Sequence, residues 1–576
     1  MLSKDRVYPI NKANRCFILG ICLVVLVSLT SLGCLEGSGQ KNDAIKVQIL
    51  AINDLHGQLE PPNGTMVTGY NEAGAPIRAD VGGVEYLSNH IKSLSSENPN
   101  TFVVSAGDNI GASPLVSAMF HDEPTIKALN MMGVDFSAVG NHELDEGLSE
   151  LMRIQNGGCH PVDGCNGNST FEGARFKFLA ANIVNESTNT TIFPAYNITY
   201  VQGVPIGFIG IALKDTPSIV TASGVKGLKF LDEASTINEY VKKLKEMGVR
   251  TIIVIIHDGG YQKGLYNESK NVSGSILDVV NATDQEVDVF VTGHTHQACN
   301  AFIDSRIVTQ TGSGGRVLTD IDLVISNETH DVVTESSRNI IVTRDLPEDP
   351  EVSELVEEYR SLVSPLANRV IGNITGNITS ATSGSGESSL GDVIADSQFN
   401  ATSNLKDGAA VVAFMNPGGI RTNLVYNQQS GDELPGQVTY GEVFSVQPFG
   451  NNLVTMTLNG SQVDTLLEQQ FDNPSPGSNR ILQVSKGFSY SWKKSAPAGE
   501  KVDISSIKLN GTPIDPNDLY RVTVNNFLAD GGDNFAVLKA GNDKLVGVKD
   551  IDAFVNYFKA FSPVASGPKD RIVLAK

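Results

Sequence analysis

Positive charge is scarce in this chain of 576 residues, because 43 lysines and arginines face 64 aspartates and glutamates, for a formal net charge of −21. Nucleic-acid polymers are bound mainly by lysine and arginine side chains that neutralise many phosphates. The charge balance therefore argues against a nucleic-acid polymer as a partner. It does not exclude a single phosphate group that is held by metal ions.

Cysteine and tryptophan are also rare, with six cysteines and one tryptophan. Past Cys34 only Cys159, Cys165 and Cys299 remain. The short segment between Cys159 and Cys165 favours a local disulfide, as expected in an oxidising compartment. Cys299 is then left without a predicted disulfide partner. A zinc knuckle that uses these two cysteines and His160 is the alternative, although the sequence offers no fourth ligand nearby.

An uncharged apolar run from Cys16 to about Leu32 follows several lysines and arginines. This order predicts that residues 1–34 are an export signal or an uncleaved membrane anchor, since ~17 residues is near the lower limit for spanning a bilayer. Leu32, Gly33 and Cys34 resemble the end of a lipoprotein cleavage box. We therefore expect an extracytoplasmic protein, secreted or attached to the outer face of the membrane only through this segment or a lipid on Cys34.

N-x-S/T sequons are frequent, and surface glycosylation of an exported protein or chance in an Asn/Ser/Thr-rich chain would each explain them. They include Asn63, Asn185, Asn189, Asn197, Asn267, Asn271, Asn373, Asn377 and Asn510.

The chain is too long for one hydrophobic core, so two domains of ~200 to 300 residues are expected. In residues 45–344, β-rich apolar runs alternate with helical stretches such as Asp232–Met247, which predicts α/β layers around a buried sheet. A charged, proline-bounded segment at 345–370 predicts a solvated connecting helix. Residues 371–576 contain strands and turns and form the second predicted domain.

Five apolar runs in the first predicted domain each end in a polar cluster that contains potential metal ligands. The pairs of run and cluster are Val47–Ile52 with Asp54 and His56, Phe102–Ala106 with Asp108, Phe136–Val139 with Asn141, His142 and Asp145, Thr251–Ile256 with His257, and Val287–Val291 with His294 and His296. A single such cluster is often only a turn or a satisfied polar residue. As a set, they fall at the strand ends where open α/β sheets place ligand sites. Mixed Asp, Asn and His ligands favour zinc or manganese over calcium.

These clusters, in their order, resemble the motif set of calcineurin-like metallophosphoesterases. The matching residues are Asp54-x-His56, Gly107-Asp108, Gly140-Asn141-His142-Glu143, His257 and Gly293-His294-x-His296. The resemblance implies an α/β metallophosphoesterase sandwich with two divalent ions that share Asp108. It implies one ion on Asp54, His56, Asp108 and His296, and the other on Asp108, Asn141, His257 and His294.

The same resemblance implies that His142 stabilises the transition state without binding metal, and that Asp145 orients its imidazole. For Asp145 a helix cap is the alternative. Two ions that are held ~3.5 to 4 Å apart can activate a water and neutralise charge on the phosphoryl oxygens.

The second predicted domain resembles the α/β C-terminal substrate-binding domain of 5'-nucleotidases. The resemblance rests on Asn416-Pro-Gly418-Gly419-Ile-Arg421, Gln447-Pro-Phe449-Gly and Asn526-Phe527-Leu-Ala-Asp-Gly-Gly-Asp533-Asn-Phe535. It implies that Phe449 and Phe527 sandwich a nucleobase and that Asn416 and Asp533 contact the base or ribose. Gly418 and Gly419 would let the backbone approach the ligand, and the planar fork of Arg421 suits phosphate oxygens. Taken singly, each Phe is more often a core residue, and the arginine a surface residue.

Together the resemblances imply hydrolysis of nucleoside 5'-monophosphates to nucleoside and phosphate by a 5'-nucleotidase-type phosphoric monoester hydrolase. The alternatives are a UDP-sugar hydrolase, a 2',3'-cyclic-nucleotide 2'-phosphodiesterase or, more remotely, an inactive surface-binding protein on the same scaffold. Animal 5'-nucleotidases carry a phosphate-contacting arginine on the helix that resembles Leu390–Asn404, and this chain has none there. Phosphate contact is therefore left to Arg421 and the metals. The sequence assigns no oligomeric state.

Overall fold

The computed structural model describes residues 44–62, 65–165, 170–428 and 433–575. The expected signal or anchor over residues 1–34, with Cys34, lies outside the described residues. Within the described ranges, no helix combines the length and the apolar character that a membrane span requires.

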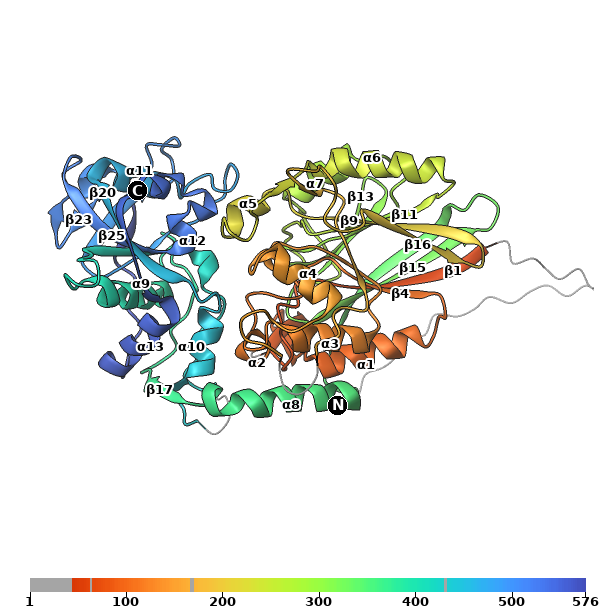
Figure 1. The fold of residues 1–576 in the computed structure, drawn as a ribbon, viewed down its shortest axis with the longest axis horizontal. Helices are drawn as coiled ribbons and strands as arrows, with labels where there is room; N and C mark the ends of the chain where they lie inside the picture. Colours follow the sequence, from red (N-terminus) through yellow and green to blue (C-terminus); the bar gives the residue numbers. More distant parts are fainter. Residues whose placement is uncertain (1–43, 63–64, 166–169, 429–432, 576) are drawn as a thin grey trace, which may run out of the picture. The chain divides into compact units, whose positions relative to one another are not determined.

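Two six-stranded sheets pack face to face in the first half of the chain (Figure 1). In spatial order, the first sheet contains β16 (Val332–Ile341), β15 (Val317–Ser326), β1 (Ala44–Ile52), β4 (Thr101–Ser105), β5 (Phe136–Ala138) and β6 (Lys177–Leu179). The second contains β13 (Ala298–Ile303), β14 (Arg306–Thr311), β12 (Val289–Val291), β11 (Thr251–Ile256), β9 (Val204–Ile211) and β8 (Tyr196–Val201). Side chains such as Ile49 from the first sheet and Phe208 from the second share one buried core. The predicted sandwich is confirmed.

Helices cover the outer face of each sheet, and Figure 1 shows α1 and α3 on the side opposite to α6 and α7. The first sheet is covered by α1 (Val84–Ser95), α2 (Leu115–Ala118), α3 (Glu123–Met132), α4 (Leu148–Asn156) and α8 (Pro350–Ala367). The second is covered by α6 (Glu233–Glu246) and α7 (Ser275–Ala282). The sequence explains α6 well, because Asp232 caps its first turn by accepting from the Ser235 N–H. Its buried residues Ile237, Val241 and Leu244 lie on one helical face.

The predicted connecting helix is present as α8, but it is not solvated on all sides. Val352, Val356, Tyr359 and Val363 recur at helical spacing and belong to the buried core of the first half. Lys127 of α3 donates a 2.8 Å hydrogen bond to the Tyr359 hydroxyl. The prediction of a solvated helix was wrong. Charged residues are prominent in the sequence of this segment, but the apolar residues between them form a stripe that packs against the core.

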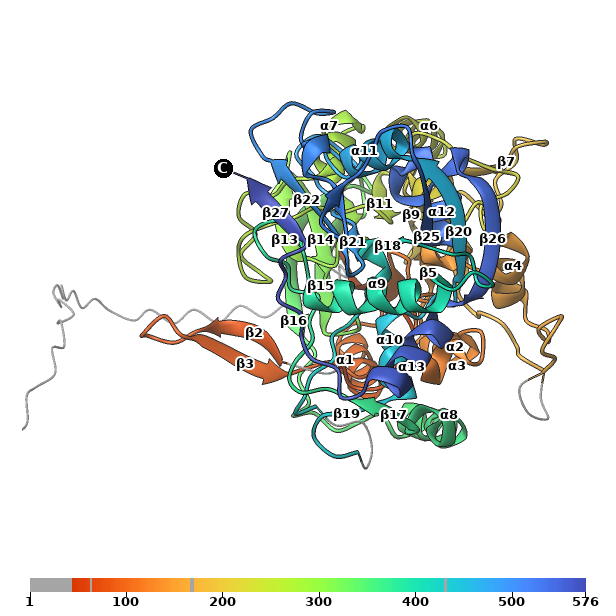
Figure 2. The same cartoon turned by 90° about the vertical axis from the view of Figure 1, so that its left-hand side faces the viewer.

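Smaller elements fill the connections of the first half. They are the hairpin of β2 (Thr65–Tyr70) and β3 (Pro76–Asp80), the pair β7 (Ile183–Asn185) and β10 (Leu228–Phe230), the short α5 (Thr216–Ile219) and the 3-10 turn η1 (His142–Leu144). Figure 2 shows the β2–β3 hairpin extending away from the sheets.

The second half of the chain is also α/β, as predicted. Its five-stranded sheet contains, in order, β21 (Gln483–Val484), β18 (Val412–Met415), β25 (Leu519–Asn525), β20 (Asn452–Asn459) and β26 (Asn542–Lys549). Further strands are β24 (Thr512–Pro513), β23 (Lys508–Leu509), β22 (Phe488–Lys493) and β27 (Ile572–Ala575), and the pair β17 (Val370–Asn373) and β19 (Gln437–Thr439). The helices are α9 (Ser389–Thr402), α10 (Tyr440–Val446), α11 (Gly460–Glu468), α12 (Asn526–Ala529) and α13 (Asp550–Phe561), with 3-10 turns η2 (Pro417–Gly419), η3 (Ile504–Ser506), η4 (Gly532–Asn534) and η5 (Ala536–Ala540). Separate apolar cores gather α11 in one cluster and α9, α10 and α13 in another.

The strand directions bring the polar clusters of the first half together. β1, β4 and β5 are parallel neighbours in the first sheet, and β11 and β12 are parallel neighbours in the second. Their carboxyl ends therefore meet at one end of the sandwich, where such sheets bind ligands.

Candidate metal centre and adjoining cavity

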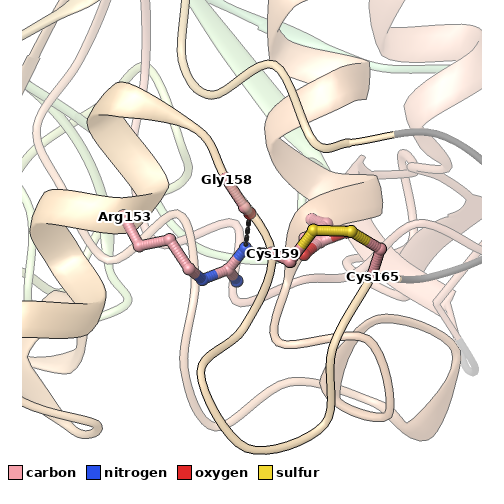
Figure 3. Close-up of a disulfide and its surroundings, with 5 residues drawn as sticks. Arg153, Gly158, Cys159 and Cys165 are labelled. Carbon is pink, nitrogen blue, oxygen red and sulfur yellow. Dashed lines mark hydrogen bonds and ion pairs between the residues drawn. A yellow bond between two sulfur atoms is a disulfide. The ribbon is translucent and has the colours of Figure 1, made fainter.

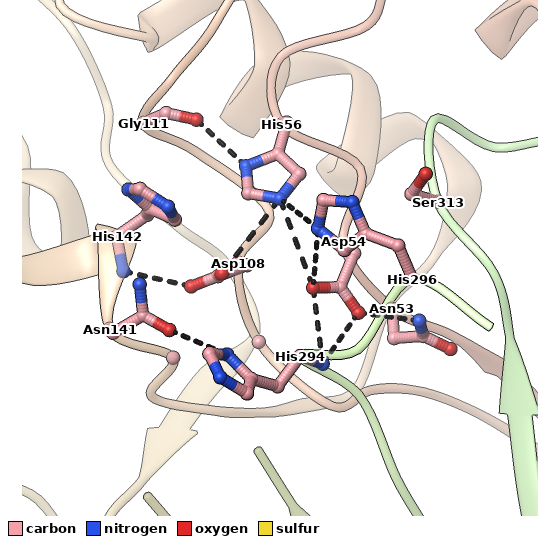
Figure 4. Close-up of polar contacts among 12 residues, drawn as sticks. Asn53, Asp54, His56, Asp108, Gly111, Asn141, His142, His294, His296 and Ser313 are labelled. Carbon is pink, nitrogen blue, oxygen red and sulfur yellow. Dashed lines mark hydrogen bonds and ion pairs between the residues drawn. The ribbon is translucent and has the colours of Figure 1, made fainter. Parts of the chain in front are cut away.

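Sharp turns follow the strands and aim their side chains at one another (Figure 4). The backbone is left-handed at these turns, with φ of 49° at Asp54, 48° at His56, 51° at Asp108, 73° at His294 and 56° at His296. This conformation is uncommon for residues other than glycine and costs about 1 to 3 kcal/mol at each position. Such strain gathers at functional sites, which marks this end of the sandwich as a candidate site.

One group of converging ligand atoms comes from Asp54, His56 and His296. The Nε2 atoms of the two histidines are 3.0 Å apart, and Nε2 of His296 lies 3.4 Å from Oδ1 of Asp54. Nδ1 of His56 lies 2.9 Å from the Gly111 carbonyl, so it donates there and leaves Nε2 as a lone-pair donor. Asn53 fixes the carboxylate by donating to Oδ2 of Asp54 at 2.6 Å.

A second group comes from Asp108, Asn141, His257 and His294. Oδ1 of Asn141 lies 3.1 Å from Nε2 of His257 and 3.0 Å from Nδ1 of His294. Nε2 of His257 is 3.1 Å from Oδ2 of Asp108. The same Asp108 oxygen is 3.8 Å from Nε2 of His56 in the first group, so Asp108 lies between the two groups.

His142 adjoins both groups, and with His56 and Asp108 it forms a further group of potential ligand atoms. Its backbone N–H donates to Oδ1 of Asp108 at 2.8 Å, and its Nδ1 lies 2.7 Å from Oδ2 of Asp145. Burial alone would lower the pKa of His142, but the carboxylates of Asp145 and Asp108 outweigh it and raise that pKa. The structure thus places the Asp145 carboxylate against the His142 ring, and the catalytic roles of the two residues stay predictions.

The charges of the cluster fit a divalent cation. Burial lowers the pKa of His257 on its own, yet the Asp108 carboxylate raises it to about 10. Burial and then the neighbouring His257 lower the pKa of His294 to about 3. The buried carboxylates thus draw positive charge into the cluster, and a bound cation can supply it while the imidazoles stay neutral as ligands.

Glu143 is the last residue of the motif Gly140-Asn141-His142-Glu143, but the sequence analysis predicted no role for it. Its Oε2 accepts from the N–H groups of Gly140 at 2.7 Å and Asp108 at 2.8 Å. Its Oε1 accepts from the backbone of Asn109 at 2.8 Å. One buried carboxylate therefore ties the loop after β4 to the loop after β5. The only local signal was a carboxylate directly after the Asn-His pair.

Two glycines allow these loops to touch. A Cβ on Gly107, where φ is +86°, would lie 2.5 Å from the Gly140 nitrogen. A Cβ on Gly140 would lie 2.2 Å from Oδ1 of Asp108. Both contacts are too short for real atoms, so the glycines place the Asp108 carboxylate.

A cavity of about 210 Å³ adjoins the metal ligands. Every substrate-binding residue predicted from the sequence lines it, namely Asn416, Gly418, Gly419, Arg421, Phe449, Phe527 and Asp533, together with Asn141, His142, Asp145 and His294. Sequence reasoning missed the other lining residues, which are Ile219, Val220, Thr221, Asn451, Arg480 and Asn525. None of these belongs to a recognisable motif.

Phe449 contacts the catalytic candidate as well as the cavity. Its ring stacks on His142 with centroids 5.6 Å apart and an interplanar angle of 19°. The Arg421 guanidinium carbon lies 5.8 Å from the same ring centroid. Burial lowers the pKa of Arg421, against the opposing pull of Asp108. Arg421 lines the cavity together with Asn141 and His142.

Gly418 and Gly419 both line the cavity, and their predicted role in ligand approach stays a prediction. A Cβ on Gly419 would lie 2.4 Å from Cε of Met415, so this glycine makes room for the core. A Cβ on Gly418 would meet only ordinary contacts. A Cβ on Gly532 would lie 2.4 Å from the Phe527 ring, so Gly532 seats that ring.

The predicted disulfide is present between Cys159 and Cys165 (Figure 3). The adjoining Gly158 carbonyl accepts a 2.9 Å hydrogen bond from Nη1 of Arg153. Cys299 is free and buried. Because the sulfurs are bonded to each other, the zinc-knuckle alternative is excluded.

His160 of the disulfide loop instead stacks on His121, with centroids 3.7 Å apart and planes 15° apart. Both rings lie beside Asp163. The ring nitrogens of both histidines and the Asp163 carboxylate lie within 4.8 Å of one another, so they form a further group of potential ligand atoms.

Two protein-family profiles match the chain. One is described as calcineurin-like phosphoesterase and matches residues 47–298, and the other is described as 5'-nucleotidase, C-terminal domain, and matches residues 370–540. Calcineurin-like phosphoesterases use divalent metals, which agrees with the ligand groups at this site.

Individual relatives extend over most of this chain. It is 32% identical to Endonuclease YhcR of Bacillus subtilis, over 92% of this chain and 41% of that protein. It is 31% identical to Cell wall protein Lmo0130 of Listeria monocytogenes, over 90% of this chain and 67% of that protein. The chain thus spans less than half the length of the first relative and about two thirds of the second. A crystal structure of a 5'-nucleotidase precursor from Thermus thermophilus superimposes with a TM-score of 0.74 at 26% identity, over 92% of this chain and all of that one.

Proposed function

Because the chain belongs to the 5'-nucleotidase family of calcineurin-like phosphoesterases, we propose that it hydrolyses nucleoside 5'-monophosphates to nucleoside and phosphate. The strongest support is that two kinds of side chain, candidate metal ligands and aromatic rings, line the same cavity. Candidate metal ligands such as Asn141 and His294 line it together with the aromatic rings of Phe449 and Phe527. A mononucleotide has the same two parts, an anionic phosphate and a flat base.

The proposed metal ligands follow the two groups of converging atoms. They are Asp54, His56, Asp108 and His296 for one divalent ion, and Asp108, Asn141, His257 and His294 for the other. When bound, two such ions supply a nucleophile at neutral pH and offset the charge on phosphoryl oxygens. Zinc and manganese suit this mixture of nitrogen and oxygen donors.

His142 and Asp145 are the proposed catalytic pair. The Asp145 carboxylate at 2.7 Å holds Nδ1 of His142 as a donor, which fixes the ring and leaves Nε2 for the substrate. Arg421 adds a planar fork of donors for the phosphate oxygens. These side chains bind and orient the phosphate.

Phosphate release from AMP, with and without a chelator, tests the proposal. We expect hydrolysis that the chelator abolishes and that added zinc or manganese restores. The control is the Asp108→Asn variant, which should stay inactive after metal is added. Hydrolysis that persists in full after the chelator has removed the metal would refute the two-metal proposal.

A substrate panel at fixed metal concentration separates the alternatives that share this chemistry. UDP-glucose and a 2',3'-cyclic nucleotide represent the sugar hydrolase and the cyclic phosphodiesterase. A DNA duplex belongs in the panel because one relative is named an endonuclease. The net charge of −21 and the cavity of about 210 Å³ favour the mononucleotide over the polymer.

Phe527 provides the cleaner test of base recognition, because Phe449 also stacks on His142. Stacking of a base on an aromatic ring is worth about 1 to 3 kcal/mol in nucleic-acid systems. Phe527→Ala should therefore lower the ratio of kcat/KM for AMP over a base-free phosphate ester by about tenfold. An unchanged ratio would contradict the base sandwich.

We also propose that the protein acts outside the cytoplasm. The apolar run Cys16–Leu32 after basic residues supports this location, and one relative is named a cell wall protein. Hydrolysis of added AMP by intact cells that express the full chain is the expected result. Activity that appears only after lysis would contradict it.

A further inference from the structure

A chain of polar contacts, which no sequence motif predicts, runs along one wall of the cavity. Nη1 of Arg480 donates to Oδ1 of Asp533 at 2.5 Å, and Nδ2 of Asn416 donates to Oδ2 of the same carboxylate at 2.9 Å. Nδ2 of Asn525 in turn donates to Oδ1 of Asn416 at 3.0 Å. All four residues line the cavity. Each oxygen of Asp533 is thus engaged, and the arginine head is held in place.

Arg480 keeps donors available for a ligand. A guanidinium carries five N–H donors and no acceptor. In the part of the chain that the structure describes, Asp533 is the one hydrogen-bond partner of this guanidinium. The Arg480 side chain is 21% exposed and lines the cavity, so its remaining donors are accessible there.

The local charge favours an uncharged acceptor over a second phosphate. Arg480 and Asp533 form an ion pair, so together they carry no net charge. Arg421, by contrast, interacts with the carboxylates of Asp108 and Asp145 at the metal centre, where the scissile phosphate is expected. Arg480 lines the cavity together with the Phe527 ring, which is proposed to stack on the base.

We infer that Arg480 is a specificity-determining residue that selects nucleotides with a carbonyl oxygen on the base edge, the 6-oxopurines and 4-oxopyrimidines. This inference rests on the proposed nucleotidase function. Hypoxanthine, guanine and uracil present an acceptor oxygen at the position where adenine and cytosine present an amino donor. An arginine has no acceptor for that amino group, so the amino bases place donor against donor. The fixed guanidinium thereby favours IMP over AMP and UMP over CMP.

The test is the ratio of kcat/KM for IMP over AMP, and for UMP over CMP, in the metal-loaded full chain. Each pair of bases differs mainly by the oxo or amino group. A hydrogen bond to a charged group that a competitor cannot make changes selectivity by about tenfold or more. We expect both ratios to be about ten in the wild type and to fall to about one in Arg480→Met, which keeps the stem and removes the donors.

Because both substrates of a pair are measured on the same sample, the ratio does not depend on how much protein is folded. Arg480→Lys is the second variant, since an ammonium can still pair with Asp533 but lacks the planar fork. It should lower both ratios as well. Arg521→Met is the matched control, because Arg521 bonds to the Gly408 carbonyl and is not among the residues that line the cavity. It should leave both ratios at the wild-type values.

Wild-type ratios near one, or ratios that Arg480→Met leaves unchanged, would overturn the inference and leave the nucleotidase function standing. Equal losses for IMP and AMP would show that Arg480 contacts the ribose or phosphate, which also overturns the base-edge assignment. Failure to hydrolyse all four nucleotides would instead overturn the proposed function itself.

Discussion

Glu143→Gln should destabilise the first half of the chain and weaken the metal centre, although the change replaces one oxygen by a nitrogen. Glu143 accepts from the N–H groups of Gly140, Asp108 and Asn109, and from the Asn109 side chain at 3.3 Å. A glutamine must turn its NH₂ group towards one side. In the less costly orientation, the glutamine NH₂ group faces Asn109. A buried N–H of the glutamine then lies opposite another donor and lacks an acceptor, which costs about 1 to 3 kcal/mol.

A second effect opposes this loss. Burial, and then the charge of Asp108, raise the pKa of Glu143 to about 7, so the ionised carboxylate is itself costly to bury. A neutral amide avoids that cost. The net destabilisation is therefore smaller than the hydrogen-bond loss, at about 1 kcal/mol, which corresponds to a fall in Tm of about 2 to 4 °C for a domain of this size. The loops that carry Asp108 and Asn141 also lose their shared tie, so less metal should bind.

Thermal unfolding followed by circular dichroism, and elemental analysis of the purified protein, measure both effects. Glu239→Gln is the matched control, because the Glu239 side chain is 62% exposed and pairs with Lys243 on the surface of α6. It should shift Tm by no more than about 1 °C, since exposed ion pairs contribute little. If Glu143→Gln behaves like this control in both Tm and metal content, the proposed tie between the loops is wrong.

Three further outcomes are expected. Asp108→Asn or His294→Ala should abolish hydrolysis and lower the bound metal measured by elemental analysis, because each removes a proposed ligand; full activity in either would refute the assignment. His142→Ala should keep its metal but lose turnover by about 10²-fold or more, and loss of metal would show that its role is wrong. His121→Gln should lower the unfolding free energy by about 1 kcal/mol at pH 6, because the half-exposed Glu146 carboxylate raises the pKa of His121 to about 9. Since the raised pKa stabilises the fold only while His121 is protonated, the difference from wild type should fade between pH 6.5 and 10; a constant difference in urea unfolding would contradict the ion pair.

Local patterns were sufficient to predict the strands and to place the proposed ligands directly after them. The run Thr251–Ile256 is β11, and His257 comes directly after it. Each ligand sits within a few residues of a strand end, so the parallel order of the sheets alone brings the ligands together. The same logic predicted α6, whose cap and apolar stripe are both local.

Long-range contacts explain what the sequence could not show. The proposed role of Arg480 depends on its contact with Asp533, and no spacing rule connects the two residues. The role of Glu143 depends on N–H groups that come from the loop after a different strand. The apolar stripe of α8 was masked by its charged residues, since the sequence does not show which face packs against the core.

The net charge and the proposed metal centre have different consequences for an anionic substrate. The net charge of −21 is spread over the whole chain and repels a long polyanion. At the site, buried carboxylates attract cations, and the guanidinium of Arg421 faces the same space. Screening limits the repulsion between distant exposed charges to about 8 Å at physiological ionic strength, whereas buried groups are screened far less. A small phosphate ester inside the cavity would therefore interact mainly with Arg421 and the proposed cations, whereas a polymer that extends over the surface would experience the net charge. Under the proposed function, the acidic surface thus restricts the size of the anionic substrate and not its charge.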